Sequence, residues 1–216
     1  METSGIKTII FDLGGVILNI DYQRTILEFT KISGFPAESI YTQQNQHDLF
    51  DSFEKGQISE NEFLTQLSQI LNEKNLEKII FAWNAMLLDF PAPRMRLLEK
   101  VKNNYHTFLF SNTNSIHLKA FEKILFQSHQ INSLSVFFQK DYYSHLLGKR
   151  KPDPESFQYI LKKHNLNPSE TLFIDDSLQH IQGAKQVGLN TYWLKKENEI
   201  LDLFEENGKL KSYLNE

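Results

Sequence analysis

An aspartate follows the first apolar run of the chain, and two glycines stand close behind it. The run Thr8–Phe11 has the apolar character of a buried strand, and Asp12, Gly14 and Gly15 come soon after it. The carboxyl end of a parallel strand is where α/β sheets carry their chemistry, and the glycines allow a turn that leaves backbone N–H groups open to an anion. Asp12 is therefore a candidate for catalysis, although helix capping explains such an aspartate about equally well.

Three later segments place polar side chains where a strand ends or a helix begins. Ser111 and Asn112 follow an apolar run and offer a hydroxyl and a carboxamide that can donate to phosphate oxygens, with helix capping as the structural alternative. Lys151 belongs to a basic run before a proline-started helix, and most such runs are solvated surface. Asp175 and Asp176 end another apolar run, and adjacent carboxylates repel each other unless a cation compensates. Hard oxygen ligands without a histidine or cysteine cluster favour Mg²⁺.

The composition excludes several classes of protein. The chain has 216 residues, 40% of them hydrophobic, and a formal net charge of −4, which argues against disorder and against nucleic-acid binding through a basic face. It has no cysteine, so thiolate nucleophiles, disulfides and zinc–thiolate sites are excluded. We expect a cytoplasmic protein without membrane contact, because no apolar run approaches the roughly 18 residues of a membrane span. The sequence carries no signal for the oligomeric state.

Residues 19–90 are predicted to form an all-helical insertion. The segment has no convincing strand, and apolar residues recur at helical spacing after Ser59. Ser59 and Glu62 have the spacing of a capping box, and Gly56 ends the preceding helix. We therefore predict a helical cap at 19–90 and a core made of residues 1–18 and 91–216.

From residue 91 onward, strands and helices alternate. Alternation of this kind predicts an α/β fold with a Rossmann-like parallel sheet flanked by helices. The expected strands are Thr107–Phe110, Val136–Phe138, Thr171–Ile174 and Thr191–Trp193. The expected helices are Pro93–Asn103, Ser115–Phe126, one after Pro154, Leu178–Val187, and a terminal helix after Lys195 that carries Ile200, Leu201 and Phe204.

The order of the polar motifs resembles that of the haloacid dehalogenase superfamily of aspartate-nucleophile hydrolases. Asp12, Ser111, Lys151 and the Asp175-Asp176 pair occur in that family's order, each at the end of a strand or the start of a helix, and the helical insertion stands where the family's cap belongs. Within the superfamily the chain is similar to the sugar-phosphate phosphatases of the α-D-glucose-1-phosphate phosphatase type, whose first motif begins Asp-Leu-Gly. Three further stretches carry this likeness: Ile20–Tyr22, Gly56–Phe63 and Arg150–Asp153.

The resemblance implies a Mg²⁺-dependent phosphatase that acts on small phosphorylated metabolites, with sugar phosphates as the expected substrates. In this interpretation Asp12 attacks phosphorus and forms an aspartyl-phosphate. Ser111 and Asn112 hold the transferring phosphoryl oxygens. Lys151 neutralises charge on the nucleophile and on the phosphate.

The resemblance also implies the ligands of the metal. Asp12, the Gly14 backbone carbonyl and Asp176 would bind Mg²⁺, while Asp175 would either ligate the ion or hold a metal-bound water. Gly14 departs from the common pattern, because most phosphatases of this class have a second Asp there that serves as general acid and base. This departure leaves open what performs the acid–base step.

Two other functions remain as alternatives. Without the usual acid at Gly14, the chain could be a slow or inactive phosphate-binding or phospho-accepting regulatory module, although such a module could have lost Lys151 and the Asp175-Asp176 pair. A 2-haloacid dehalogenase also lacks the second Asp, but its chemistry attacks carbon and needs no metal. The carboxylate pair therefore favours the phosphatase.

We interpret six further polar or aromatic residues as structural and not as part of a functional site. Three in the insertion could reach over the site as a substitute acid, but helix surfaces are normally polar, so we interpret His47, Asp48 and Glu54 as solvated. Phe50 and Trp83 could stack on a sugar, but we expect them to pack inside the insertion. We interpret His180 as a residue of a helix surface.

Overall fold

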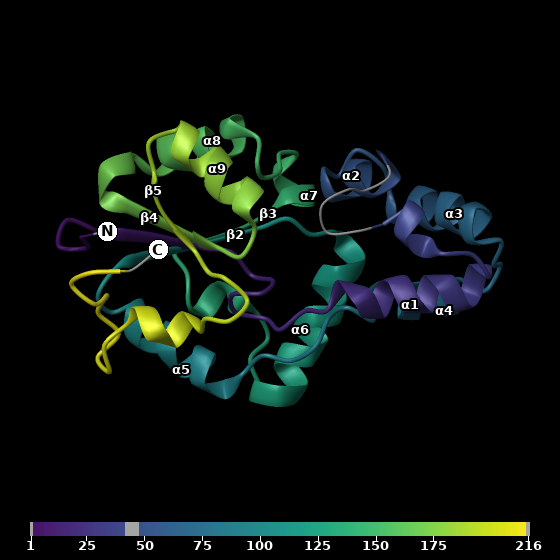
Figure 1. Cartoon of the computed structure of the whole chain (residues 1–216), viewed down its shortest axis with the longest axis horizontal. Helices are drawn as coiled ribbons and strands as arrows, with labels where there is room; N and C mark the ends of the chain where they lie inside the picture. Colours follow the sequence, from purple (N-terminus) through teal and green to yellow (C-terminus); the bar gives the residue numbers. More distant parts are fainter. Residues whose placement is uncertain (1, 42–47, 215–216) are drawn as a thin grey trace.

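The computed structural model describes residues 2–41 and 48–214, and its centre is a sheet of five parallel strands (Figure 1). The spatial order is β3-β2-β1-β4-β5, so the first strand of the chain lies in the middle of the sheet. This arrangement confirms the predicted parallel α/β fold. The bounds are β1 Thr8–Phe11, β2 His106–Ser111, β3 Lys140–Tyr143, β4 Thr171–Asp175 and β5 Asn190–Trp193.

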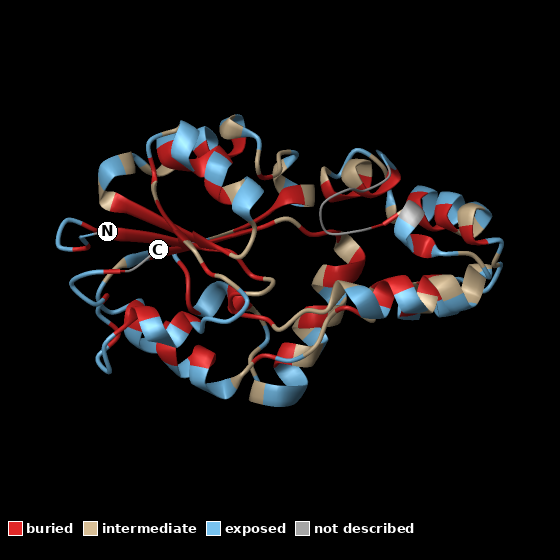
Figure 2. Cartoon of the chain, viewed as in Figure 1, coloured by how far each residue is buried: buried red, intermediate tan, exposed pale blue. Residues whose placement is uncertain are grey.

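Helices cover both faces of the sheet, because alternate residues of each central strand point to opposite sides. Ile9 and Phe11 of β1 pack on one face with α5 (Ala92–Val101), α6 (Ser115–His129) and the C-terminal segment. Ile10 packs on the other face with α8 (Pro154–His164) and α9 (Leu178–Gln186). Figure 2 shows the strands as a buried layer between these helices.

In the described part of the chain between β1 and α5, four α-helices lie at one end of the molecule, beside the carboxyl ends of the strands (Figure 1). They pack on their own apolar cluster, whose largest member is the fully buried Trp83, and Ile116 of α6 joins that cluster. The predicted capping box is present, since Ser59 and Glu62 exchange hydrogen bonds at the start of the third helix. The bounds of this helical segment are α1 Tyr22–Ser33, α2 Asp48–Glu54, α3 Glu60–Leu71 and α4 Leu76–Asn84.

The expected strand at Val136–Phe138 is wrong. A 3₁₀ turn at Leu134–Val136 occupies this place, and the edge strand β3 begins later, at Lys140. Phe137 and Phe138 are apolar because they fill the core beneath the sheet, while β3 starts with a polar residue because it lies at an exposed edge. An apolar run marks burial and does not by itself mark strand pairing.

The expected terminal helix is also wrong. Only a 3₁₀ turn forms, at Ile200–Leu203, and the chain then folds back so that Phe204 pairs with Leu210 in an antiparallel bridge. Gly208 adopts a left-handed φ of 80° in the return, a conformation that glycine permits and that interrupts helical periodicity. Among the residues that the structure describes, none of the helices combines the length and apolar character that crossing a bilayer requires.

Candidate active site

The topology of the sheet brings the predicted polar residues together. Asp12 follows β1, Ser111 ends β2 and Asp175 ends β4, and these three strands are neighbours in the sheet. The Asp12 backbone N–H donates to the Ile174 carbonyl at 2.9 Å, which extends the pairing of β1 with β4 up to the aspartate. The side chains that follow the three strands therefore meet at one edge of the sheet.

Three carboxylates form a cluster at this edge. One oxygen from each of Asp12, Asp175 and Asp176 lies within 4.8 Å of the others. Gly15 lets the backbone approach the cluster, because a Cβ at this position would lie only 2.5 Å from an Asp176 carboxylate oxygen and the residue has a φ of 74°. The second glycine after the first strand is thus required both for its conformation and for its lack of a side chain.

Lys151 is the buried cation beside this cluster. Its Nζ donates to Asp12 Oδ1 at 2.6 Å and to Asp175 Oδ2 at 2.7 Å, and its side chain is fully buried. The ammonium also lies 5.4 Å from the ring centroids of Phe110 and Phe173, which face it from β2 and β4. The basic run that contains Lys151 is therefore more than solvated surface.

The Asn112 side chain fixes the backbone of Lys151. Its Nδ2 donates to the Lys151 carbonyl and its Oδ1 accepts from the Lys151 N–H, both at 2.9 Å. One of the two amide N–H groups of Asn112 is thereby used, and the other has no hydrogen-bond acceptor among the described residues. Ser111 is buried and lines the same cavity as Asp12.

The three carboxylates have different pKa values for identifiable reasons. Burial raises the pKa of Asp176 to about 8, and the neighbouring Asp12 and Asp175 carboxylates add to the rise. Burial also raises the pKa of Asp12 to about 6, although the Lys151 ammonium acts to lower it. Burial acts on Asp175 in the same direction, but the Lys151 ammonium and His180 outweigh it and bring its pKa down to about 2.

The donor set fits a hard divalent cation. Oxygen atoms of three carboxylates converge, and the positive charge that the chain supplies here is too small to keep Asp176 ionised at neutral pH. A carboxylate whose pKa is raised by burial and by like charges is stabilised in its ionised form when a cation binds. Oxygen ligands are those that Mg²⁺ prefers.

His180 and Glu54 line the cavity. The interpretation of Glu54 as solvated is wrong, and His180 does more than occupy a helix surface because it contacts Asp175. His180 Nδ1 lies 3.0 Å from both carboxylate oxygens of Asp175, so the first turn of α9 points this ring back at the strand end. Glu54 is 7% exposed and forms an ion pair with Arg150. Spacing on α2 could have indicated Glu54, because it follows Phe50 by four residues and shares that buried helix face.

The other residues singled out in the helical segment differ in their exposure. Asp48 is exposed, as expected. Phe50 and Trp83 are fully buried within the segment, which confirms that they pack there. His47 lies outside the described residues.

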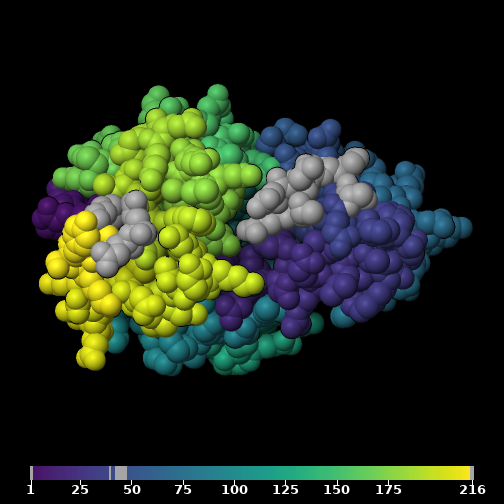
Figure 3. Space-filling view, viewed as in Figure 1, coloured from purple at the N-terminus to yellow at the C-terminus, as the bar shows by residue number. Residues whose placement is uncertain are grey.

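A cavity of about 260 Å³ connects the carboxylate cluster with the helical segment. In the space-filling view the helical segment, coloured purple to blue, and the region of the sheet, coloured green to yellow, form two lobes that meet (Figure 3). Residues from both lobes line the cavity: Asp12, Ser111 and Asp176 at the strand ends, and Tyr22, Asp51 and Glu54 from the helical segment. A ligand bound at the strand ends would thus extend toward α1 and α2.

Several proteins with similar sequences are phosphatases. The D-ribitol-5-phosphate phosphatase of Bacteroides thetaiotaomicron is 32% identical over 188 residues, which cover 87% of this chain and 91% of that protein. The glyceraldehyde 3-phosphate phosphatase of Pyrococcus furiosus is 36% identical over 110 residues, or 50% of this chain and 43% of that protein.

Solved structures support the same relationship. A HAD family enzyme of Bacteroides thetaiotaomicron in complex with magnesium and inorganic phosphate has 33% sequence identity and a TM-score of 0.83, covering 93% of this chain and 100% of that one. A HAD-like hydrolase of Porphyromonas gingivalis has 29% identity and a TM-score of 0.82, covering 92% and 96%. A family model for haloacid dehalogenase-like hydrolases matches residues 6–188. The chain therefore belongs to the haloacid dehalogenase-like hydrolases.

Proposed function

We propose that this protein is a Mg²⁺-dependent phosphatase that hydrolyses small phosphorylated metabolites, sugar phosphates among them, in the cytoplasm. The observation that carries the proposal is the contact of Lys151 with Asp12, at the carboxyl end of the central strand and next to two more carboxylates. Related phosphatases act on ribitol 5-phosphate and glyceraldehyde 3-phosphate, which are substrates of this class.

In the proposed reaction Asp12 is the nucleophile. The Asp12 carboxylate attacks phosphorus, the bond from phosphorus to the ester oxygen breaks, and water then hydrolyses the aspartyl-phosphate. The 2.6 Å bond from Lys151 favours the ionised, nucleophilic form of Asp12 and places positive charge next to the phosphoryl group. Ser111 and the remaining amide N–H of Asn112 donate to the phosphoryl oxygens, while the Asn112 side chain positions Lys151.

The proposed ligands of Mg²⁺ are Asp12, the Gly14 carbonyl and Asp176. Bound there, the ion would offset the negative charge of the nucleophile and of the phosphate. Both oxygens of Asp175 already have partners, since Oδ1 accepts from the Ser177 N–H at 2.8 Å and Oδ2 accepts from Lys151. We therefore propose that Asp175 positions Lys151 or a metal-bound water. It is a weaker candidate for a direct metal ligand than Asp12 and Asp176.

The helical segment, within residues 19–90, would act as the cap of this site. Its helices supply one wall of the cavity that contains Asp12, so a substrate would lie between the segment and the sheet. Exclusion of water by such a wall strengthens every electrostatic contact with the phosphate.

Phosphate release from a panel of phosphorylated metabolites, with Mg²⁺ and with excess chelator, tests the proposal. Wild-type protein and the control Asp48→Asn should release phosphate only with Mg²⁺. Asp12→Asn should release none while remaining folded. Phosphate release by Asp12→Asn at the wild-type rate would exclude the covalent route. Stable phosphorylation of Asp12 without turnover would favour the phospho-accepting regulatory module instead.

A further inference from the structure

Two polar atoms in the wall of the cavity are buried without a hydrogen-bond partner. Among the described residues, five side chains have such an atom, and two of the five line the cavity: Glu54, through Oε2, and Arg150, through Nε. One atom is an acceptor and the other is a donor. Glu54 Oε2 has an ion pair with Arg150 Nη2 but no hydrogen bond, and a buried polar atom that lacks a hydrogen bond is a candidate for contact with a ligand.

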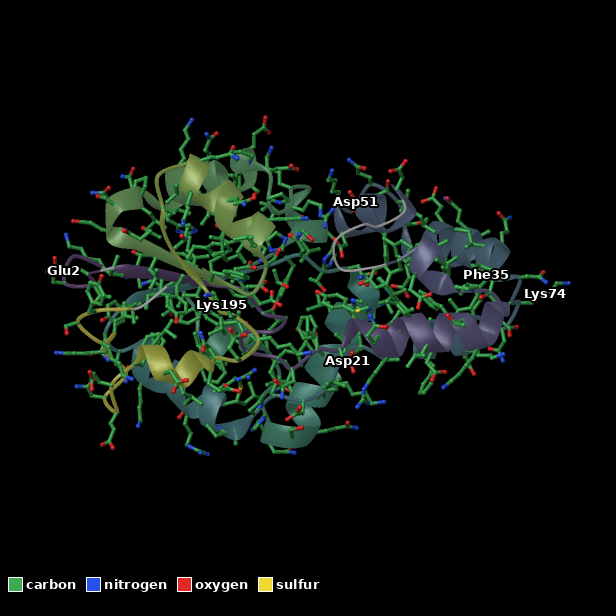
Figure 4. The ribbon with its side chains drawn as sticks, in the orientation of Figure 1. Glu2, Asp21, Phe35, Asp51, Lys74 and Lys195 are labelled. Atoms are coloured by element: carbon green, nitrogen blue, oxygen red, sulfur yellow. The ribbon has the colours of Figure 1, made fainter. Side chains whose placement is uncertain are left out.

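The two side chains are held next to each other by ion pairs. Arg150 Nη2 lies 3.0 Å from Glu54 Oε2, and Arg150 Nη1 pairs with Asp51, one helical turn earlier on α2. Figure 4 shows Asp51 at the end of the helical segment that faces the sheet. The guanidinium thus balances the charge of Glu54 through its outer nitrogens, while its Nε and the Glu54 oxygen keep unused hydrogen-bonding capacity.

Arg150 and Glu54 line the same cavity as Asp12. Arg150 immediately precedes Lys151, whose ammonium bonds to Asp12, and its side chain is 15% exposed. On the other side, the turn after α2 lies close to the core, because a Cβ at Gly56 would come within 2.1 Å of the His145 carbonyl oxygen. The pair is therefore a fixed part of the cavity wall and is held from both lobes.

A hydroxyl group can form a hydrogen bond with each member of this pair. A hydroxyl donates one hydrogen bond and accepts others, so it can donate to Glu54 Oε2 and accept from Arg150 Nε. An ionised carboxylate or a phosphate dianion could not donate to Glu54, and an ammonium could not accept from Arg150. A hydrocarbon would leave Arg150 Nε without an acceptor and would give Glu54 Oε2 no hydrogen bond.

We propose that Glu54 and Arg150 form a hydroxyl-binding subsite, and that the substrate is a phosphate monoester of a polyol or sugar with a hydroxyl on its carbon chain. This inference rests on the phosphatase activity proposed above and assigns its substrate class. With the phosphate at Asp12, the carbon chain extends along the cavity toward α2, and a hydroxyl on that chain meets the pair. Glu54 and Arg150 are then specificity-determining residues.

The test uses wild-type protein, so that it does not depend on a variant that folds. The substrates are ribitol 5-phosphate, its analogues that each lack one hydroxyl, and n-pentyl phosphate. We expect kcat/KM to be at least tenfold higher for ribitol 5-phosphate than for n-pentyl phosphate, with one hydroxyl accounting for most of the difference. Equal kcat/KM across the series would overturn the subsite and leave the phosphatase in place. No phosphate release from any substrate would overturn the proposed function itself.

Variants of Glu54 test whether this pair causes the preference for a hydroxylated substrate. Glu54→Leu, which removes the acceptor at similar volume, should lower the kcat/KM ratio between the hydroxylated and the matched deoxy substrate toward one. Glu54→Gln, which keeps a weaker neutral acceptor, should retain part of the preference, and the exposed control Asp48→Asn should retain all of it. An unchanged ratio in folded Glu54→Leu would refute the assignment. An equal loss on both substrates would also refute it, because a proton donor to the ester oxygen serves both alike.

Discussion

Binding of Mg²⁺ should release protons from the carboxylate cluster. Without metal, Asp176 has a pKa of about 8 and Asp12 a pKa of about 6, and burial is the main cause of both rises. Metal ligation requires the ionised carboxylates. At pH 7 about nine tenths of Asp176 and about one tenth of Asp12 carry a proton, so binding should release about one proton in total.

The dependence on pH follows from these two values. Between pH 6 and 8 the affinity for Mg²⁺ should rise about tenfold per pH unit, and above pH 8 it should level off because both carboxylates are already ionised. Protein stability should change in the opposite direction when metal is absent. A group whose pKa is higher in the folded than in the unfolded state stabilises the fold below its unfolded value, and this contribution is lost as pH rises through the folded value.

Isothermal titration calorimetry in two buffers of different ionisation enthalpy measures the proton count at pH 7. Asp48→Asn should match wild type, because Asp48 is exposed and outside the cluster. Asp176→Asn should bind Mg²⁺ more weakly and release almost no proton. Tight binding of Mg²⁺ at pH 7 without proton release would refute the reasoning, since it would mean that Asp176 is already ionised in the metal-free protein.

Three further changes have defined outcomes. Gly14→Asp should narrow the kcat/KM advantage of aryl over primary-alkyl phosphates, because a carboxyl can then protonate the departing oxygen, an effect of about 10²–10⁴-fold. A Cβ at position 14 would lie 2.8 Å from Ile20 Cδ1, so the melting temperature of the variant is measured as well. If the folded variant keeps the full kcat/KM advantage of aryl phosphates, the expectation is wrong. Lys151→Met should destabilise the protein by about 3–5 kcal/mol in urea unfolding at pH 7, because Asp12 loses its buried partner; equal stability would argue against the pairing. Ser59→Ala should cost about 1 kcal/mol in the same measurement, since it removes the cap of α3, and no cost would mean that solvent replaces the cap.

Much of the fold could be predicted from the sequence because local patterns and packing agree. Apolar runs bounded by polar residues located β1, β2, β4 and β5, and the Ser59 capping box located the start of α3. The errors occurred where burial and secondary structure differ. Phe138 is buried without belonging to a strand, and the chain reverses near Gly208 instead of continuing as a helix.

The polar residues at the strand ends could be predicted to meet, because the order of parallel strands fixes which ends are neighbours. The partners of these residues could not be predicted in the same way. The bonds from Asn112 to the Lys151 backbone depend on the path of a loop, and the contact of His180 with Asp175 depends on the rotation of α9. Glu54 reaches the site only because α2 docks against the core, a contact between lobes for which the sequence carries no pattern.

The charges of the site explain why protonation alone cannot offset its negative charge for the binding of a phosphate ester. Three ionised carboxylates and the Lys151 ammonium give this group a net charge of −2. Each pair of like unit charges about 4 Å apart costs about 4 kcal/mol near a protein surface, so a phosphate dianion would be repelled. A proton on Asp176 lowers this net charge only to −1, and a second proton on Asp12 would neutralise the group but would block the proposed nucleophile. A divalent cation would balance the same charge and leave Asp12 ionised, so the carboxylate cluster and the proposed nucleophile would depend on the same bound ion.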